Sequence, residues 1–207
     1  MMEMPKNSKV IYLYRHGETT WNVEDRIKGQ LDDKDTQFTE LGMEQIRELS
    51  HKLIANDIQV IYCSDYKRTF ETAKMANNQL GVSIICQKEL HGLNMGHFQG
   101  RILNECVEEY ELKKSFMDYD LPVGGGESIN QLNARIVNFV LKVCRSTEYS
   151  RIAIITHSAA ISNLKAYLTH EKYISLNECI LLFQDNQLFV MNSVPNYTKY
   201  NKKEIRE

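Results

Sequence analysis

Residues 10–17 read Val-Ile-Tyr-Leu-Tyr-Arg-His-Gly, an apolar run that ends in a cation, an imidazole and a glycine. β-Branched and aromatic side chains in such a run are typical of a buried strand. Arg15 and His16 follow it at the strand's carboxyl end, the edge at which open α/β sheets bind ligands. Gly17 allows a sharp backbone turn. The stretch therefore indicates an anion site at a strand end.

Two further apolar runs lead into groups that suit a phosphate. Residues 58–63 predict a strand, and the helix after it carries Arg68. Residues 151–156 predict another strand, which leads through His157 and Ser158 into a helix. Arginine donates parallel hydrogen bonds to an oxyanion, and free N–H groups at a helix start favour an anion. If the three strands are neighbours, two histidines and two arginines share one pocket.

Strand and helix patterns alternate along the chain. Other strands are expected near residues 82–86, 180–184 and 188–192, and other helices near 39–56, 102–117 and 128–147. This order predicts an α/β fold, a single-domain α/β/α sandwich with a mostly parallel central sheet and helices on both faces. The helix that follows Thr39 is expected to bury Leu41, Ile46, Leu49 and Leu53.

The chain length bounds the domain organisation. At 207 residues, one domain over residues 1–207 is expected. The stretch near 90–126 contains several glycines and is interpreted as an insertion over the active site. The charged tail, residues 197–207, is expected to be flexible.

Composition narrows the choice of partners and compartment. The formal net charge of -2 gives no broad field for nucleic acid or anionic lipid. No apolar run approaches the ~20 residues that span a bilayer, and no signal peptide is expected at the N-terminus. The five cysteines are widely spaced and odd in number, which fits reduced thiols. We therefore expect a cytoplasmic protein with no nucleic-acid or membrane partner.

The motifs, taken in order, resemble those of the histidine phosphatase superfamily, in the branch that holds cofactor-dependent phosphoglycerate mutase and its phosphatase relatives. Arg-His-Gly-Glu-Thr-Thr-Trp-Asn at residues 15–22 is similar to the family signature. Further matches lie at residues 26–29, 39–42, 64–73, 96–100, 125–128 and 156–158. The resemblance covers most of the chain, and it implies the fold and the chemistry of that family.

The resemblance also implies a role for individual residues. By this resemblance, His16 is the phosphoacceptor, and the phosphoryl oxygens are bound by Arg15, Arg68 and His157. Family positions that contact substrate correspond to Asn22, Lys28, Gly29 and the backbone N–H of Ser158. No metal is implied, and no cofactor is expected.

The sequence departs from the family pattern at two positions. Ser158 stands where the family usually has a glycine, which is a mild change if only its N–H is used. The family's proton donor is a glutamate that aligns with Gly92. Glu89 is the expected substitute in catalysis, and His91 and His97 are lesser candidates.

The interpretation that follows is a metal-independent phosphatase. It would hydrolyse a phosphomonoester or an activated phosphoryl compound through a phosphohistidine on His16. A phosphoglycerate mutase-type phosphotransferase and a catalytically weak phosphate-binding regulatory module are the alternatives. The short, acidic segment 101–120 favours the phosphatase over the mutase. The expected substrate is a small phosphorylated metabolite or a phosphoprotein. Assembly into a homodimer is compatible with the sequence.

Overall fold

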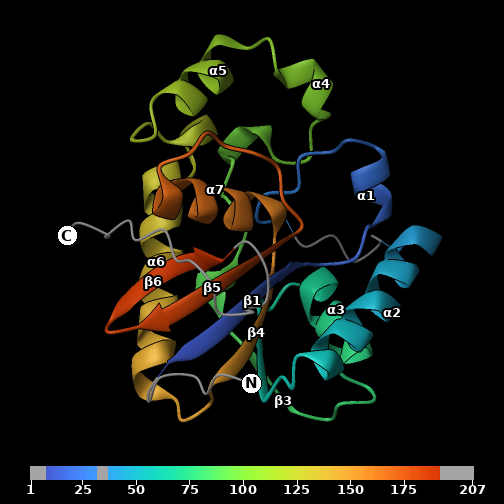
Figure 1. Cartoon of the computed structure of the whole chain (residues 1–207). Helices are drawn as coiled ribbons and strands as arrows, with labels where there is room; N and C mark the ends of the chain where they lie inside the picture. The colour runs from blue at the N-terminus through green and yellow to red at the C-terminus, as the bar shows by residue number, and fades with distance from the viewer. Residues whose placement is uncertain (1–7, 32–36, 192–207) are drawn as a thin grey trace.

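The computed structural model describes residues 8–31 and 37–191, and the tail expected at 197–207 lies outside this part. Within it, a six-stranded sheet has the order β3-β2-β4-β1-β5-β6 (Figure 1). The strands are β1 (Lys9–Arg15), β2 (Val60–Cys63), β3 (Ser83–Cys86), β4 (Arg151–Thr156), β5 (Glu178–Gln184) and β6 (Gln187–Met191). The four strands from β3 to β1 are parallel, and β5 and β6 are antiparallel. The mostly parallel α/β sheet is thus confirmed.

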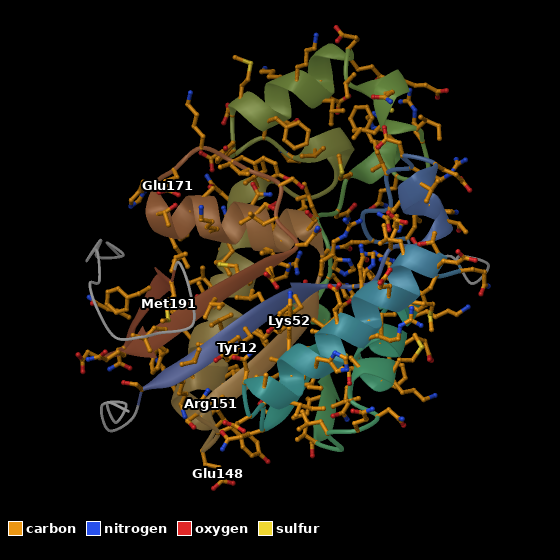
Figure 2. The ribbon with its side chains drawn as sticks, turned by 45° about the vertical axis from the view of Figure 1, so that its right-hand side comes forward. Tyr12, Lys52, Glu148, Arg151, Glu171 and Met191 are labelled. Atoms are coloured by element: carbon orange, nitrogen blue, oxygen red, sulfur yellow. The ribbon has the colours of Figure 1, made fainter. Side chains whose placement is uncertain are left out.

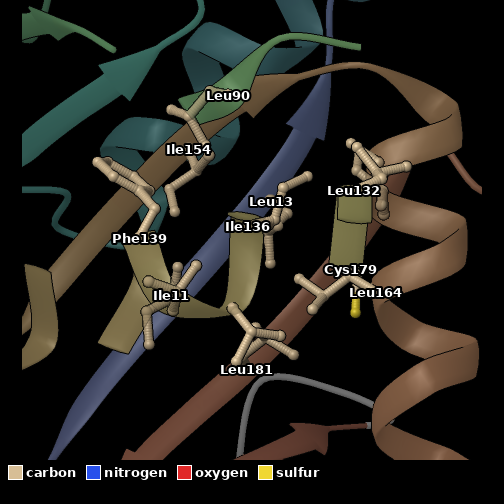
Figure 3. Packing of buried hydrophobic residues seen from close by; sticks show 14 of the residues in the cluster. Ile11, Leu13, Leu90, Leu132, Ile136, Phe139, Ile154, Leu164, Cys179 and Leu181 are labelled. Carbon is tan, nitrogen blue, oxygen red and sulfur yellow. The ribbon is translucent and has the colours of Figure 1, made fainter. Parts of the chain in front are cut away.

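Alternation along β1 divides the core into two layers. Ile11 and Leu13 pack with residues of α6 (Ile129–Ser146) and α7 (Ser158–Thr169) on one face (Figure 3). Successive side chains of a strand point to opposite faces. Tyr12 therefore packs on the other face, with residues of α2 (Glu40–Ala55) and α3 (Lys67–Ala76). Figure 2 shows Tyr12 beside α2, the helix that carries Lys52. Helices on both faces of the sheet agree with the prediction.

The first long helix begins where its capping residue predicts. Oγ1 of Thr39 accepts a hydrogen bond from the N–H of Gly42 at 3.0 Å, which satisfies one free donor of the first turn of α2. Ile46, Leu49 and Leu53 are buried as expected, but Leu41 is 50% exposed, so that part of the prediction is wrong. At about 100° per residue, position 41 lies about 140° around the helix from position 46.

The segment between β3 and α6 forms one end of the molecule, with α4 and α5 at the top of Figure 1. It contains α4 (Leu103–Cys106), α5 (Tyr110–Met117) and the 3-10 turns Lys88–Leu90, Gly96–Phe98 and Val123–Gly125. The single helix expected over 102–117 is therefore wrong. Cys106 and Leu112 are both buried in the core, although six residues of helix would place them about 120° apart. A break between them lets both face the core.

Membrane crossing requires a long apolar helix. Across residues 8–31 and 37–191, none of the helices has the length and apolar content to span a bilayer.

Truncation of Leu53 tests the inner face of α2. Leu53 is 0% exposed, so Leu53→Ala removes buried methyl groups and leaves a cavity, at an expected cost of about 2–5 kcal/mol in the free energy of unfolding. Leu41→Ala in the same helix is the matched control and should cost less than about 1 kcal/mol. Urea unfolding of both variants measures the difference, and equal losses would contradict the assignment of the buried face.

Candidate active site

The register of β1 against β4 brings the two sequence-predicted histidines together. Arg15 pairs with Thr156, and the N–H of His16 donates to the carbonyl of Thr156 at 3.1 Å. His16 directly follows Arg15, and His157 directly follows Thr156. The two histidines are therefore at equivalent positions, one residue beyond the last pair of the two strands. The two imidazole centroids are 5.4 Å apart, with the ring planes at 67°. The two histidines thus meet at one edge of the sheet, as expected from the two strand ends.

The chain turns away from His16 through a crowded Gly17. A Cβ at this position would lie 2.8 Å from the carbonyl oxygen of Gly42, so a larger residue requires α2 to move. The N–H of Gly17 also donates to Oγ1 of Thr72 at 3.1 Å, which fixes the turn to α3. His16 is thereby held between the sheet and two helices.

Hydrogen bonding fixes the tautomer of His16. Nδ1 of the ring lies 2.8 Å from the carbonyl oxygen of Gly17. Because a carbonyl oxygen only accepts, Nδ1 carries the proton and Nε2 keeps its lone pair. Burial, followed by the charges of Arg68, Lys28 and Arg15, holds the pKa of His16 well below its usual range. The imidazole is therefore neutral near pH 7 and can act as a nucleophile.

His157 occupies the N-cap position of α7. Its side chain is 6% exposed, and Nε2 is buried with no hydrogen-bond partner among the residues described. Burial, then the charge of Arg68 and the neighbouring imidazoles of His16 and His91, holds the pKa of His157 well below its usual range. A buried polar nitrogen without a partner is costly, so this atom is suited to meet a bound oxyanion or its proton.

The two arginines are held by different elements. Arg68 of α3 is buried and donates from Nη1 to the carbonyl of Leu31 at 2.7 Å and from Nη2 to that of Gly29 at 3.1 Å. Arg15 is half-buried and donates from Nη1 to Oδ1 of Asn177 at 3.2 Å. Both cations lower the pKa of His16, so both lie close enough to act on the pocket electrostatically.

The expected substrate-contacting residues form a network next to the histidines. Oδ1 of Asn22, on α1 (Thr20–Val23), accepts from Nζ of Lys28 at 2.7 Å, and Nζ also donates to Oγ1 of Thr19. Gly29 supplies the carbonyl that Arg68 binds. Asn22 and Lys28 are therefore joined to each other, and Gly29 is joined to α3 through Arg68.

Ser158 lies at the first position of α7 and turns its hydroxyl away from this network. Its Oγ donates to the carbonyl of Leu176 at 2.9 Å and lies 3.2 Å from Oγ of Ser175. N–H groups in the first turn of a helix have no acceptor within the helix. The backbone of Ser158 remains suited to anion contact, as its sequence position suggests.

Gly92 lies close against His157 and Gly29, with little space for a side chain. A Cβ there would lie 3.3 Å from Cγ of His157 and 3.0 Å from the carbonyl oxygen of Gly29. A side chain at position 92 would thus project between His157 and the Lys28–Gly29 loop. Glu89 lies in the 3-10 turn Lys88–Leu90, where its carbonyl accepts from Nη1 of Arg135 at 2.6 Å.

The two lesser histidine candidates differ in position. His91 stacks on Tyr66 with ring centroids 4.0 Å apart, and its Nε2 is hydrogen-bonded to Asp65. The Tyr66 ring in turn lies 5.8 Å from that of His157. His97 is paired with Glu111 at 3.6 Å, and both of these side chains are 53% exposed. The Asp65–His91–Tyr66 contact was missed because no sequence spacing signals a pairing across 26 residues.

Metal binding requires a cluster of suitable ligands. Across the part of the chain that the structure describes, His, Cys, Asp and Glu side chains form no group of three that could hold a metal ion.

Comparison with known proteins assigns the chain to a class. Residues 11–186 match the profile of the histidine phosphatase superfamily (branch 1), and the chain belongs to this family. Phosphoglycerate mutase-like protein 4 of Arabidopsis thaliana is 32% identical over 161 residues, which cover 74% of this chain and 68% of that protein. "Probable phosphoglycerate mutase GpmB" of Escherichia coli K12 is 35% identical over 160 residues, with coverage of 74% and 72%.

Solved structures support the fold. YhfR of Bacillus stearothermophilus superposes with a TM-score of 0.75 at 24% identity, over 88% of this chain and 95% of that chain. The architecture is therefore that of histidine phosphatase folds.

The buried imidazoles predict a specific pH dependence of stability. Since His16 and His157 have lowered pKa values when folded, the unfolded chain binds more protons below about pH 6.5. Stability should fall with decreasing pH by up to about 1.4 kcal/mol per pH unit for each histidine. Urea unfolding at pH 7.5 and 5.5 measures this loss. His16→Asn and His157→Asn should each lose less over the same interval, whereas parallel losses would contradict the prediction.

Proposed function

We propose that this protein is a metal-independent phosphatase that forms a phosphohistidine on His16. The observation that carries the proposal is the neutral His16 ring, whose Nδ1 proton is engaged by Gly17 and whose Nε2 is left as a nucleophile. Buried cations beside it suit the charge of a transferring phosphoryl group. The substrate would be a phosphomonoester or an activated phosphoryl compound, carried by a small metabolite or a phosphoprotein.

Each group then has a role in two successive transfers. Nε2 of His16 attacks phosphorus and the leaving oxygen departs; water next attacks the phosphohistidine and releases phosphate. Arg15, Arg68 and His157 would bind the phosphoryl oxygens, with Asn22, Lys28, Gly29 and the N–H of Ser158 as further substrate contacts. The two transfers share one pocket, so no second site is required.

A mutase is the second candidate because curated relatives at 32–35% identity carry phosphoglycerate mutase names. Such an enzyme returns the phosphoryl group to a second hydroxyl. The segment above the pocket argues for water instead, since its acids already engage nearby basic groups: Glu108 with Lys113, Glu109 with Arg101 and Glu111 with His97. These pairs engage the charges of Arg101, Lys113 and His97, which would otherwise attract a second phosphorylated group.

A catalytically weak phosphate-binding module is the third candidate, and Gly92 is the observation behind it. The absence of a side chain beside His157 removes the residue that aligns with the family's acid. We also propose a cytoplasmic location, which is supported by five cysteines that are all free thiols.

Trapping of the intermediate tests the proposal. After incubation with a labelled phosphodonor and a rapid quench, we expect acid-labile label on the wild-type protein and none on His16→Ala. His97→Ala is the matched control, because that ring lies exposed and paired with Glu111, and it should keep the label.

The fate of the label separates the three candidates. Release as inorganic phosphate supports the phosphatase, and transfer to a second hydroxyl supports the mutase. If no label forms and an activated aryl phosphate is not turned over, the binding module is favoured and the proposed function is overturned.

A further inference from the structure

The two imidazoles of the site are surrounded by cations. The charges that act on His16 come from Arg68, Lys28 and Arg15, and those on His157 from Arg68, Lys28 and other imidazoles. In residues 8–31 and 37–191, no carboxylate is among them. Departure of an alkoxide from phosphorus nevertheless needs a proton. If the proposed function is correct, a group other than a carboxylic acid must supply this proton.

Lys28 is the titratable side chain best placed to do so. Its side chain is buried, and Nζ donates to Oγ1 of Thr19 and Oδ1 of Asn22. An ammonium group has three N–H bonds, so one remains for a ligand after these two contacts. Among the described residues, no third acceptor contacts it.

A cavity extends from this ammonium group. Its volume is about 250 Å³, and both Lys28 and Arg68 line it. Trp21, Phe38 and Met75 supply apolar walls. Lys67 and Glu71 line the same cavity. In the proposed reaction, a leaving group that enters this cavity would bring its oxygen toward Nζ of Lys28.

The backbone around Lys28 is held firmly. The N–H of Ile27 donates to the carbonyl of Arg101 at 2.8 Å, and the N–H of Gly100 donates to the carbonyl of Ile27 at 2.7 Å. Arg26 forms an antiparallel bridge with Ile102. These bonds fix the start of the lysine side chain, which limits the reorganisation needed for proton transfer.

We propose that Lys28 is the general acid and base of the reaction, in the place of a carboxyl group. In the first transfer, a bond forms between Nε2 of His16 and phosphorus, the phosphorus–oxygen bond to the leaving group breaks, and that oxygen takes a proton from the Lys28 ammonium. In the second, water attacks phosphorus, the nitrogen–phosphorus bond breaks, and the Lys28 amine takes the proton from water. The ammonium group is thereby restored.

The electrostatic surroundings suit both steps. Burial, then Arg68 and Arg15, lowers the pKa of Lys28 to about 7, while the carboxylate of Glu18 opposes the shift. A bound phosphate dianion favours the charged ammonium, so the acid is protonated when substrate is present. A pKa close to the working pH makes both donation and recovery of the proton efficient.

Other titratable groups lie nearby. Glu71 lines the same cavity, but its charge is not among those that act on Lys28 or on either imidazole. His91 is held by Asp65, and the ring of Tyr66 lies in contact with both His91 and His157. The charge of Glu89 is not among those that act on either pocket imidazole. Glu89→Gln is therefore the matched comparison for any change at Lys28.

The test compares two leaving groups in kcat/KM, which reports only steps through phosphorylation of His16. Lys28→Gln and Lys28→Arg cannot release a proton near neutral pH, and the arginine keeps the charge. For an alkyl phosphate, both variants should lose about 10²–10⁴-fold. For p-nitrophenyl phosphate, whose leaving group needs no proton, the loss should stay below about tenfold.

Other outcomes overturn the proposal. Equal losses on both substrates would make Lys28 a binding or positioning residue, and no loss on either would remove it from the reaction. A leaving-group-dependent loss in Glu89→Gln, with none in the Lys28 variants, would assign the proton to Glu89. Because turnover of p-nitrophenyl phosphate and label on His16 are read in the same variants, failure of this proposal is distinguishable from failure of the phosphatase proposal.

Discussion

The parallel pairing of β1 with β4 is the constraint on which the site depends. It sets Arg15 opposite Thr156, so the next residue on each strand is a histidine, and the imidazoles meet at 5.4 Å. A slip of one residue would turn every side chain of β1 to the opposite layer of the core. Burial of Ile11 on one face and Tyr12 on the other prevents that slip. The hydrophobic layers therefore also fix the distance between the two histidines.

The pocket concentrates positive charge in a chain whose formal net charge is -2. Arg68 and Lys28 are buried, and burial of a charged group is costly unless it is paired or hydrogen-bonded. Part of the cost is avoided because both imidazoles stay neutral, and part is offset by backbone carbonyls, such as those of Leu31 and Gly29 around Arg68. A phosphate group that enters, as the proposed function requires, would add negative charge beside these cations.

The sequence was sufficient for the parts of the site that sit at strand ends. Arg15, His16 and His157 follow runs whose hydrophobic pattern marks strands, and parallel strands bring their carboxyl ends to one edge. Arg68 could be predicted because it lies in the first turn of the helix after β2. The position of Leu41 and the break between α4 and α5 could not, because packing against distant residues decided them. The Asp65–His91 contact and the burial of Lys28 are likewise products of the tertiary fold.

The bridge between Arg26 and Ile102 joins two parts of the molecule that are far apart in sequence. One is the loop that carries Lys28 and Gly29, beside the two histidines of the site. The other begins the α4–α5 segment at the end of the molecule (Figure 1). The N–H of Ile27 donates to the carbonyl of Arg101, and the N–H of Gly100 donates to the carbonyl of Ile27, so the two parts are expected to move together. A change in the α4–α5 segment would therefore also displace the loop that carries Lys28 and Gly29, so these two parts of the chain cannot diverge independently.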